Sequence, residues 1–205
     1  MSKERDKATS KAASKATKGD GWKSNLLTIG GALVLALFIR VTLFEAFAID
    51  GPSMEPSLLD GDRVVVAKYP FGLFLPFTHE AAVNWGGPDP GDIIILHSPA
   101  DNEDIVKRVI GVGGDTILIR DGKISRNGED LGTTELGPCD AEEQRSIDPT
   151  CRVYSEVLDG VPHRISHSKH DFPLDRLPLE VPEGHVYVLG DHRDSSNDSR
   201  NPLIG

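Results

Sequence analysis

The organisation of this chain is decided by residues 49–62, which read IDGPSMEPSLLDGD. They separate a long apolar run from the first predicted β-strand. Gly51 permits backbone conformations that other residues avoid, Pro52 fixes its own φ and lacks an N–H, and Pro56 interrupts regular structure again. The stretch therefore predicts a rigid, non-helical bend that presents Ser53. The alternative is a plain linker between an anchor and a soluble domain, because serine is common in turns.

The length of 205 residues allows one sizeable domain with additional segments. The net charge is −10, and it is unevenly distributed. Residues 1–25 contain seven Lys and Arg against three Asp and Glu, so this part carries +4 and the remainder −14. Residues 1–25 are rich in Lys, Ala, Ser and Thr and are predicted to be a disordered cytoplasmic tail. The acidic remainder argues against nucleic-acid binding.

Residues 26–47 are the predicted transmembrane anchor. The segment starts with an uncharged apolar run, and Arg40 and Glu45 would reach toward the far interface. A bilayer needs roughly 20 residues, which the whole segment provides. The Lys-rich tail predicts an N-terminus in the cytoplasm and everything after the anchor outside. The alternatives are a signal peptide cleaved after Ala46-Phe47-Ala48, which has the small-x-small form, and a buried core helix.

Residues 48–205 are predicted to form a mainly β, extracytoplasmic domain with antiparallel, barrel-like sheets. The predicted strands are residues 63–67, 93–97, 105–110, 116–119, 123–125, 152–157 and 185–189. Asp121-Gly122 is a strong signal for a two-residue hairpin turn. Residues 120–182 are read as an insertion, because the segment from Asn127 to Pro182 is acidic, turn-rich and irregular.

The insertion contains both cysteines, Cys139 and Cys151, which an extracytoplasmic location allows to form a disulfide. The nearby His163, His167 and His170 match no usual zinc spacing, so no metal is predicted.

Residues 69–77, YPFGLFLPF, are aromatic, Pro-rich and uncharged. Ordinary core packing explains them. A loop in contact with lipid is the alternative, because the domain starts at the bilayer.

Lys107 interrupts an otherwise apolar strand. Strand alternation places it on one face with Ile105 and Val109. Partial burial there would disfavour the ammonium and lower the pKa of the lysine, as a general base requires. The alternative is a lysine that protects an edge strand from pairing.

Residues 190–200, GDHRDSSNDSR, follow the last predicted strand. They predict a tight hydrogen-bonded loop in which Arg193 and Arg200 pair with carboxylates. A solvated surface loop is the alternative.

Five motifs in this order resemble the bacterial type I signal peptidases, or leader peptidases. These are membrane-anchored serine proteases that use a Ser/Lys dyad. The motifs are residues 51–58, 61–66, 91–95, 107–115 and 190–200, and the resemblance covers Leu26 to Arg200.

The resemblance implies that Ser53 is the nucleophile, Lys107 the general base and Ser196 the residue that orients the lysine. Residues implied to support the site are Arg108, Asp191, Asp198 and Arg200. Residues implied to bind substrate are Phe47, Ile49, Met54, Leu58, Ile105 and Val106. No cofactor is implied.

The implied activity is removal of signal peptides from exported preproteins after Ala-x-Ala sites, at the outer face of the bacterial cytoplasmic membrane. The resemblance also implies that residues 48–205 are the catalytic domain. Signal peptides and membrane lipid are the expected partners, the secretion channel is a further candidate, and no nucleic acid is expected. A peptidase dedicated to one pilin or conjugation substrate and a catalytically silent binding domain remain as alternatives.

The sequence departs from the family pattern in three places. Gly51 stands where some members place a serine that helps to bind the oxyanion, and His192 stands where Asn is frequent. Relatives usually continue beyond the position of Gly205 with another short strand, so the sequence is either truncated or divergent there.

Overall fold

The computed structural model describes residues 21–74, 81–98, 103–140, 144, 148–168 and 176–201. The chain divides into two compact units, which are treated separately. The first consists of Met1–Glu45 and Val66–Trp85, and the second of Ala46–Val65 and Gly86–Gly205. Most of the predicted disordered tail, together with His170 and Gly205, lies outside the described residues.

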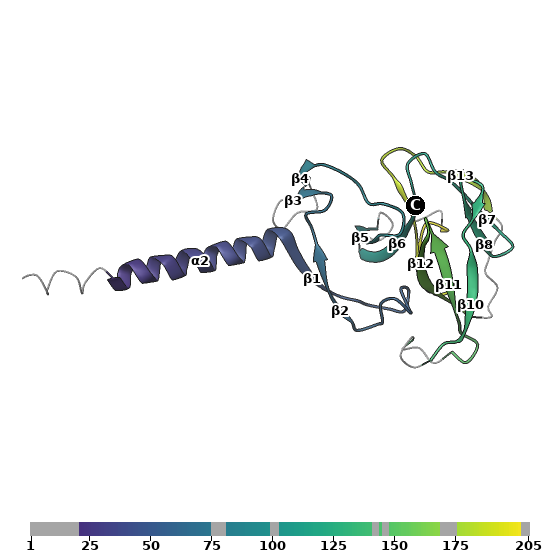
Figure 1. Ribbon diagram of the computed structural model, residues 1–205, viewed down its shortest axis with the longest axis horizontal. Coiled ribbons are helices and arrows are strands. Elements are labelled where there is room, and N and C mark those ends of the chain that lie inside the picture. Colours follow the sequence, from purple (N-terminus) through teal and green to yellow (C-terminus); the bar gives the residue numbers. More distant parts are fainter. Residues whose placement is uncertain are drawn as a thin grey trace, which may run out of the picture. The chain divides into compact units, whose positions relative to one another are not determined.

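The first unit contains the helix α2, Gly21–Leu43, drawn in purple and blue in Figure 1. Its Gly21–Arg40 part is 20 residues long with a mean hydropathy of 1.6, and none of that stretch is buried against the rest of the protein. The helix is therefore long and apolar enough to cross a membrane. The buried core helix considered as an alternative is wrong.

The helix boundaries differ from the predicted 26–47. The helix starts at Gly21 and ends at Leu43, and the next residues form strand β1, Phe44–Ala48. This strand pairs with β2, Arg63–Ala67, whose β-branched residues favour an extended backbone. The N–H of Lys68 donates to the carbonyl of Leu43 at 2.9 Å, which joins the helix end to the residue after β2.

The first residue of the aromatic stretch 69–77 is not part of a buried core, in contrast to the core packing considered for it. Tyr69 is 47% exposed and meets the ring of Phe44 edge-on. Strand β3, Gly72–Phe74, pairs with β4, Ala81–Asn84. The last residues of the stretch, 75–77, lie outside the described part of the chain.

The second unit is built from antiparallel sheets, as the sequence predicted. One sheet has the order β14-β6-β5, another β13-β7-β8-β9, and a third β10-β11-β12. Their bounds are β5 Ile93–His97, β6 Asp104–Val112, β7 Thr116–Arg120, β8 Lys123–Arg126, β9 Glu129–Asp130, β10 Thr133–Pro138, β11 Arg152–Leu158, β12 Val161–His167, β13 Arg176–Glu180 and β14 Val186–Leu189.

A cluster of buried apolar residues from several of these strands forms the core of the unit. It consists of Ile110, Ile117, Ile119, Ile124, Leu158, Val181, Tyr187 and Leu189. The core joins the sheet that carries Lys107 to the two neighbouring sheets, because β6, β7, β8, β11 and β14 all contribute side chains.

Strand β6 lies at the centre of its sheet, between β5 and β14. Lys107 pairs in register with Ile94 of β5, and Arg108 with Leu189 of β14. The alternative of a lysine that protects an edge strand is therefore wrong.

Residues 127–182 are more regular than predicted. Strands β11 and β12 pair over seven residues, and β10 pairs with the other edge of β11, as Figure 1 shows. The β11–β12 turn is Asp159-Gly160, with φ of 51° and 79°. It repeats the chemistry of the correctly predicted Asp121-Gly122 turn, with φ of 50° and 71°. The predicted disulfide between Cys139 and Cys151 is present.

Candidate active site

Residues 49–62 form a closed loop rather than an extended linker. The N–H of Ile49 donates to the backbone carbonyl of Asp62 at 2.8 Å, and the N–H of Gly61 donates to the backbone carbonyl of Ile49 at 2.9 Å. These two bonds join the two ends of the loop. Gly51 has φ of 86°, and its N–H donates to Oδ1 of Asp60. The predicted non-helical bend is confirmed, and its conformation at position 51 is one that glycine adopts most readily.

The loop brings Ser53 into contact with Lys107 on the central strand β6. Nζ of Lys107 donates to Oγ of Ser53 at 2.9 Å and to the carbonyl of Val106 at 2.8 Å. The lysine is only 3% exposed. Burial lowers the pKa of Lys107 below its usual value, and the charges of Asp198 and Asp191 oppose that shift only in part. The pair therefore joins a hydroxyl to an amine that is biased toward its neutral form.

Two arginine–carboxylate pairs lie around this contact. Arg108 makes a bidentate pair with the buried Asp191 at 2.8 and 2.7 Å, and it also donates to the carbonyl of Gly91. Arg200 makes a bidentate pair with Asp198 at 2.8 Å for each bond. Burial alone would raise the pKa of Asp198, but Arg200 and the N–H of Gly190 hold it below its usual value.

Ser196 lies near the Asp198 carboxylate and helps to keep that group ionised. Its Oγ is buried and makes no hydrogen bond of good geometry within the described part of the chain. The implied role of Ser196 in orienting Lys107 therefore stays a prediction.

The six residues implied to bind substrate differ in exposure. Ile49 is 4% exposed and Met54 is fully buried. The other four, Phe47, Leu58, Ile105 and Val106, are partly exposed. Ile105 and Val106 directly precede the lysine on β6, so they lie beside the candidate dyad.

A third arginine–carboxylate pair belongs to this region, and the sequence predicted only its arginine. Arg193 makes a bidentate pair with Glu156 of β11, with one bond of 2.8 Å. Burial would raise the pKa of Glu156, but Arg193 and His163 hold it at about 2. The sequence predicted a carboxylate partner for Arg193 but could not choose one 37 residues away.

His192 departs from the family pattern. Its backbone contacts the loop of residues 49–62, which carries the candidate nucleophile Ser53 and is called the nucleophile loop below. Its N–H donates to the carbonyl of Ser53 at 3.1 Å. The ring is buried, with Nδ1 4.0 Å from Glu55, and burial lowers the pKa of His192 although the charge of Glu55 opposes this. A different side chain at this position leaves the backbone contact possible.

Comparison with known proteins identifies the family of this chain. The sequence model of the family described as Signal peptidase, peptidase S26, matches residues 22–205. Signal peptidase I of Bacillus licheniformis is 34% identical over 173 residues, which cover 84% of this chain and 74% of that protein. Signal peptidase I of Rickettsia bellii is 31% identical over 204 residues, which cover 90% of this chain and 67% of that protein.

Signal peptidase I of Pseudomonas fluorescens is 33% identical over 171 residues, or 82% of this chain. The match spans only 58% of the length of the Pseudomonas protein. The family model nevertheless extends from the membrane-competent helix through both parts of the Ser53–Lys107 contact. The chain belongs to the signal peptidase family, peptidase S26.

Proposed function

We propose that this protein is a membrane-anchored serine endopeptidase that removes N-terminal signal peptides from exported preproteins. The observation that supports it most directly is the 2.9 Å contact between Oγ of Ser53 and Nζ of a lysine that is 3% exposed. A serine hydroxyl is a weak nucleophile unless an adjacent base removes its proton. Lys107 can act as that base only when neutral, and its burial favours the neutral form.

In the acylation step, Oγ of Ser53 attacks the scissile carbonyl carbon while its proton passes to Nζ of Lys107. The tetrahedral intermediate then breaks the C–N bond, and the lysine ammonium gives this proton to the departing amine. The products are an ester on Ser53, a free amino terminus on the mature protein and a neutral lysine.

In the deacylation step, a water molecule takes the place of the departed amine. Nζ of Lys107 accepts one proton as the water oxygen attacks the ester carbon, and the proton then passes to Oγ of Ser53 as the ester bond breaks. The signal peptide leaves with a free carboxylate, and both catalytic side chains return to their starting state.

The negative charge on the intermediate needs hydrogen-bond donors. Position 51 supplies no side chain, so the backbone N–H of Ser53 would bind the oxyanion, with a neighbouring backbone group or water as second donor. The left-handed φ of 86° at Gly51 would strain a serine, although the space around its Cα is open.

The proposed substrate has small side chains one and three residues before the cleaved bond. Partly exposed Ile105 and Val106 on β6, with Phe47 and Leu58, are the apolar residues proposed to receive them. The helix α2 would hold the catalytic unit at the outer face of the bacterial cytoplasmic membrane, with a Lys-rich N-terminus inside. Lipid would be one partner, and the secretion channel is proposed as a second.

The test is cleavage of purified preproteins by the full chain in detergent. Ser53→Ala removes the nucleophile, and Lys107→Met removes the amine while keeping most of the side-chain volume. Both are expected to abolish processing and to keep the wild-type circular dichroism spectrum. Wild-type cleavage by Lys107→Met would refute the dyad. A panel of unrelated preproteins separates a general peptidase from one dedicated to a single pilin or conjugation substrate, and a wild-type chain that cleaves nothing would indicate a silent binding domain.

A further inference from the structure

Ser166 is a buried serine that the proposed mechanism does not use. It lies on β12, Val161–His167, within the inserted sheet, and is 1% exposed. Its Oγ donates to the carbonyl of Glu55 at 2.9 Å. Glu55 stands two residues after the candidate nucleophile, so this hydroxyl joins the nucleophile loop to a strand 111 residues away along the chain. A longer contact runs from the loop to the same strand, because Oγ of Ser57 donates to the carbonyl of Arg164 at 3.4 Å.

The backbone of Ser166 is fixed at the same time by residues 191–193. Its N–H donates to the carbonyl of Asp191 at 2.9 Å, and its carbonyl accepts from the N–H of Arg193 at 3.0 Å. Between these two bonds, His192 forms a parallel bridge with Ser166 and donates its own N–H to the carbonyl of Ser53. One serine is therefore connected to both segments that frame the site.

These contacts hold the nucleophile loop at two points. The carbonyl of Ser53 accepts from His192, and the carbonyl of Glu55 accepts from Ser166. Met54, between them, is fully buried. The two hydrogen bonds restrict rotation of the peptide groups between residues 53 and 54 and between residues 55 and 56. With the side chain of Met54 packed between them, they limit the directions in which Oγ of Ser53 can point.

We propose that Ser166 is a positioning residue for the nucleophile, and that the inserted β11–β12 hairpin is part of the catalytic scaffold. The proposal rests on the endopeptidase function proposed above. The hydroxyl of Ser166 touches no reacting atom. It acts through the Glu55 carbonyl, which it keeps in one place while the tetrahedral intermediate forms on Ser53.

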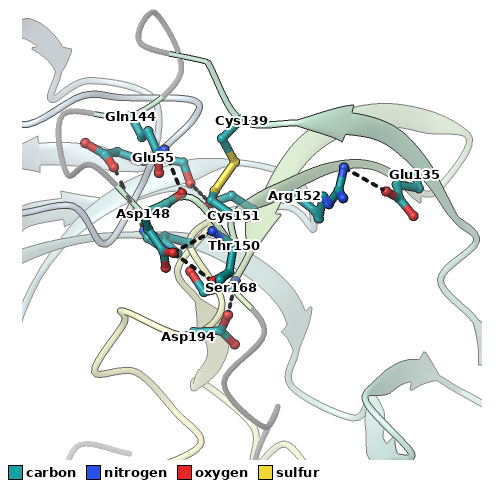
Figure 2. The surroundings of a disulfide bond; sticks show 12 residues. Glu55, Glu135, Cys139, Gln144, Asp148, Thr150, Cys151, Arg152, Ser168 and Asp194 are labelled. Atoms are coloured by element: carbon teal, nitrogen blue, oxygen red, sulfur yellow. Dashed lines mark hydrogen bonds and ion pairs between the residues drawn. A yellow bond between two sulfur atoms is a disulfide. The ribbon is translucent and has the colours of Figure 1, made fainter.

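The hairpin is itself braced, as a scaffold requires. Glu156 of β11 is paired with Arg193, and Cys151, directly before β11, forms a disulfide with Cys139, directly after β10. Figure 2 shows Glu55 among the residues that surround this disulfide. Contacts from the hairpin to the nucleophile loop are therefore made by a strand with little freedom to move.

Ser125 offers a matched control. It is a buried serine on β8, 7% exposed, whose hydroxyl points at a strand carbonyl, that of Leu118. Neither residue belongs to the proposed catalytic machinery. A general loss of stability from removing a buried hydroxyl would affect Ser125→Ala and Ser166→Ala alike, whereas a loss of nucleophile positioning would affect only Ser166→Ala.

The experiment compares wild type, Ser166→Ala, Ser166→Thr, Ser125→Ala and Ser53→Ala as full chains in detergent. For Ser166→Ala we expect kcat to fall about tenfold, the scale of one net hydrogen bond, with KM within about twofold of wild type. The apparent pKa of the acid limb of the kcat/KM–pH profile should stay at its wild-type value, because the substitution does not touch Lys107. Acylation by a small serine-directed probe should slow by the same factor, and Ser166→Thr should recover most of the rate.

A wild-type kcat for Ser166→Ala, or an equal loss in Ser125→Ala, would overturn the positioning role. So would a loss confined to KM, which would indicate an effect on peptide binding. Failure of the underlying function looks different, because Ser53→Ala would then still cleave. An inactive Ser53→Ala together with a fully active Ser166→Ala would reject only the inference about Ser166.

Discussion

Gly190 is the position at which a single methyl group should disturb the nucleophile most directly. It follows strand β14 and has no side chain, so its backbone approaches the nucleophile loop closely. A Cβ built there would lie 2.4 Å from the carbonyl oxygen of Ser53 and 2.2 Å from Oγ of Ser196. Its φ is outside the left-handed region, so alanine is strained by this contact and not by its own backbone.

The size of the effect follows from these distances. An ordinary contact with a Cβ begins at 3.4 Å, so the Ser53 carbonyl and the Gly190 backbone must separate by about 1 Å. Oγ of Ser196 can rotate away, but its Cβ, 2.4 Å from the built Cβ, can move only with the backbone of the 190–200 loop. The Ser53 oxygen is backbone as well and can move only with the candidate nucleophile. A misplacement of about 1 Å in a catalytic group can lower the rate on the order of a hundredfold. We expect kcat of Gly190→Ala to fall by about that factor.

The assay is steady-state cleavage of a preprotein in detergent, with the Tm measured in parallel. Gly113→Ala is the control for crowding, because its Cβ would lie 2.9 Å from backbone Cα of Glu183, away from the dyad. Gly132→Ala is the open control, with nothing within 4 Å. We expect Gly113→Ala to lower the Tm and Gly132→Ala to change little, and both to keep kcat. A kcat for Gly190→Ala within about threefold of wild type would refute the reasoning.

Three further predictions concern charge and stability. Asp198→Asn removes a charge that raises the pKa of Lys107, so the acid limb of kcat/KM should move to lower pH; movement to higher pH would contradict this. Glu156→Leu and Arg193→Met should each lower the unfolding free energy by about 3–5 kcal/mol, because each leaves a buried charge without its partner. The double variant removes both charges, so its unfolding free energy in urea denaturation should be near that of wild type. Because the pKa of Glu156 is depressed to about 2, wild type should keep this stabilisation above pH 4.5 and lose it toward pH 2, a dependence absent from the double variant. Reducing the Cys139–Cys151 disulfide should lower the urea-derived unfolding free energy by about 2–4 kcal/mol, and an unchanged midpoint would contradict it.

Most of the strands could be predicted because their signals are local. Runs of β-branched residues directly after Gly-Asp turns match the strands Arg63–Ala67 and Ile93–His97. The end of the helix could not be placed in this way, since Phe44–Ala48 is apolar at every position except Glu45 and so continues the apolar pattern of the helix. What makes these residues a strand is pairing with β2, a partner about twenty residues further along the chain.

The insertion shows the same limit. Asp159-Gly160 carries the hairpin signal that was read correctly at Asp121-Gly122. The acidic, turn-rich surroundings hid it, so strand β12 was not predicted. The contact of Ser166 with the nucleophile loop could not be predicted either. Nothing in the sequence around a serine in a β-strand indicates which distant carbonyl its hydroxyl will bind.

The candidate site explains how a lysine between two carboxylates can still have a lowered pKa. Asp191 and Asp198 would both favour the ammonium form of Lys107 if they acted as isolated charges. Each carboxylate instead has its own bidentate arginine, Arg108 for the first and Arg200 for the second. The field of each pair at the lysine is close to that of a dipole, so burial outweighs it. The two arginines therefore help to keep the pKa of Lys107 low. Removing either one should raise that pKa and weaken the lysine in its proposed role as a base, which a shift of the acid limb of kcat/KM to higher pH would reveal.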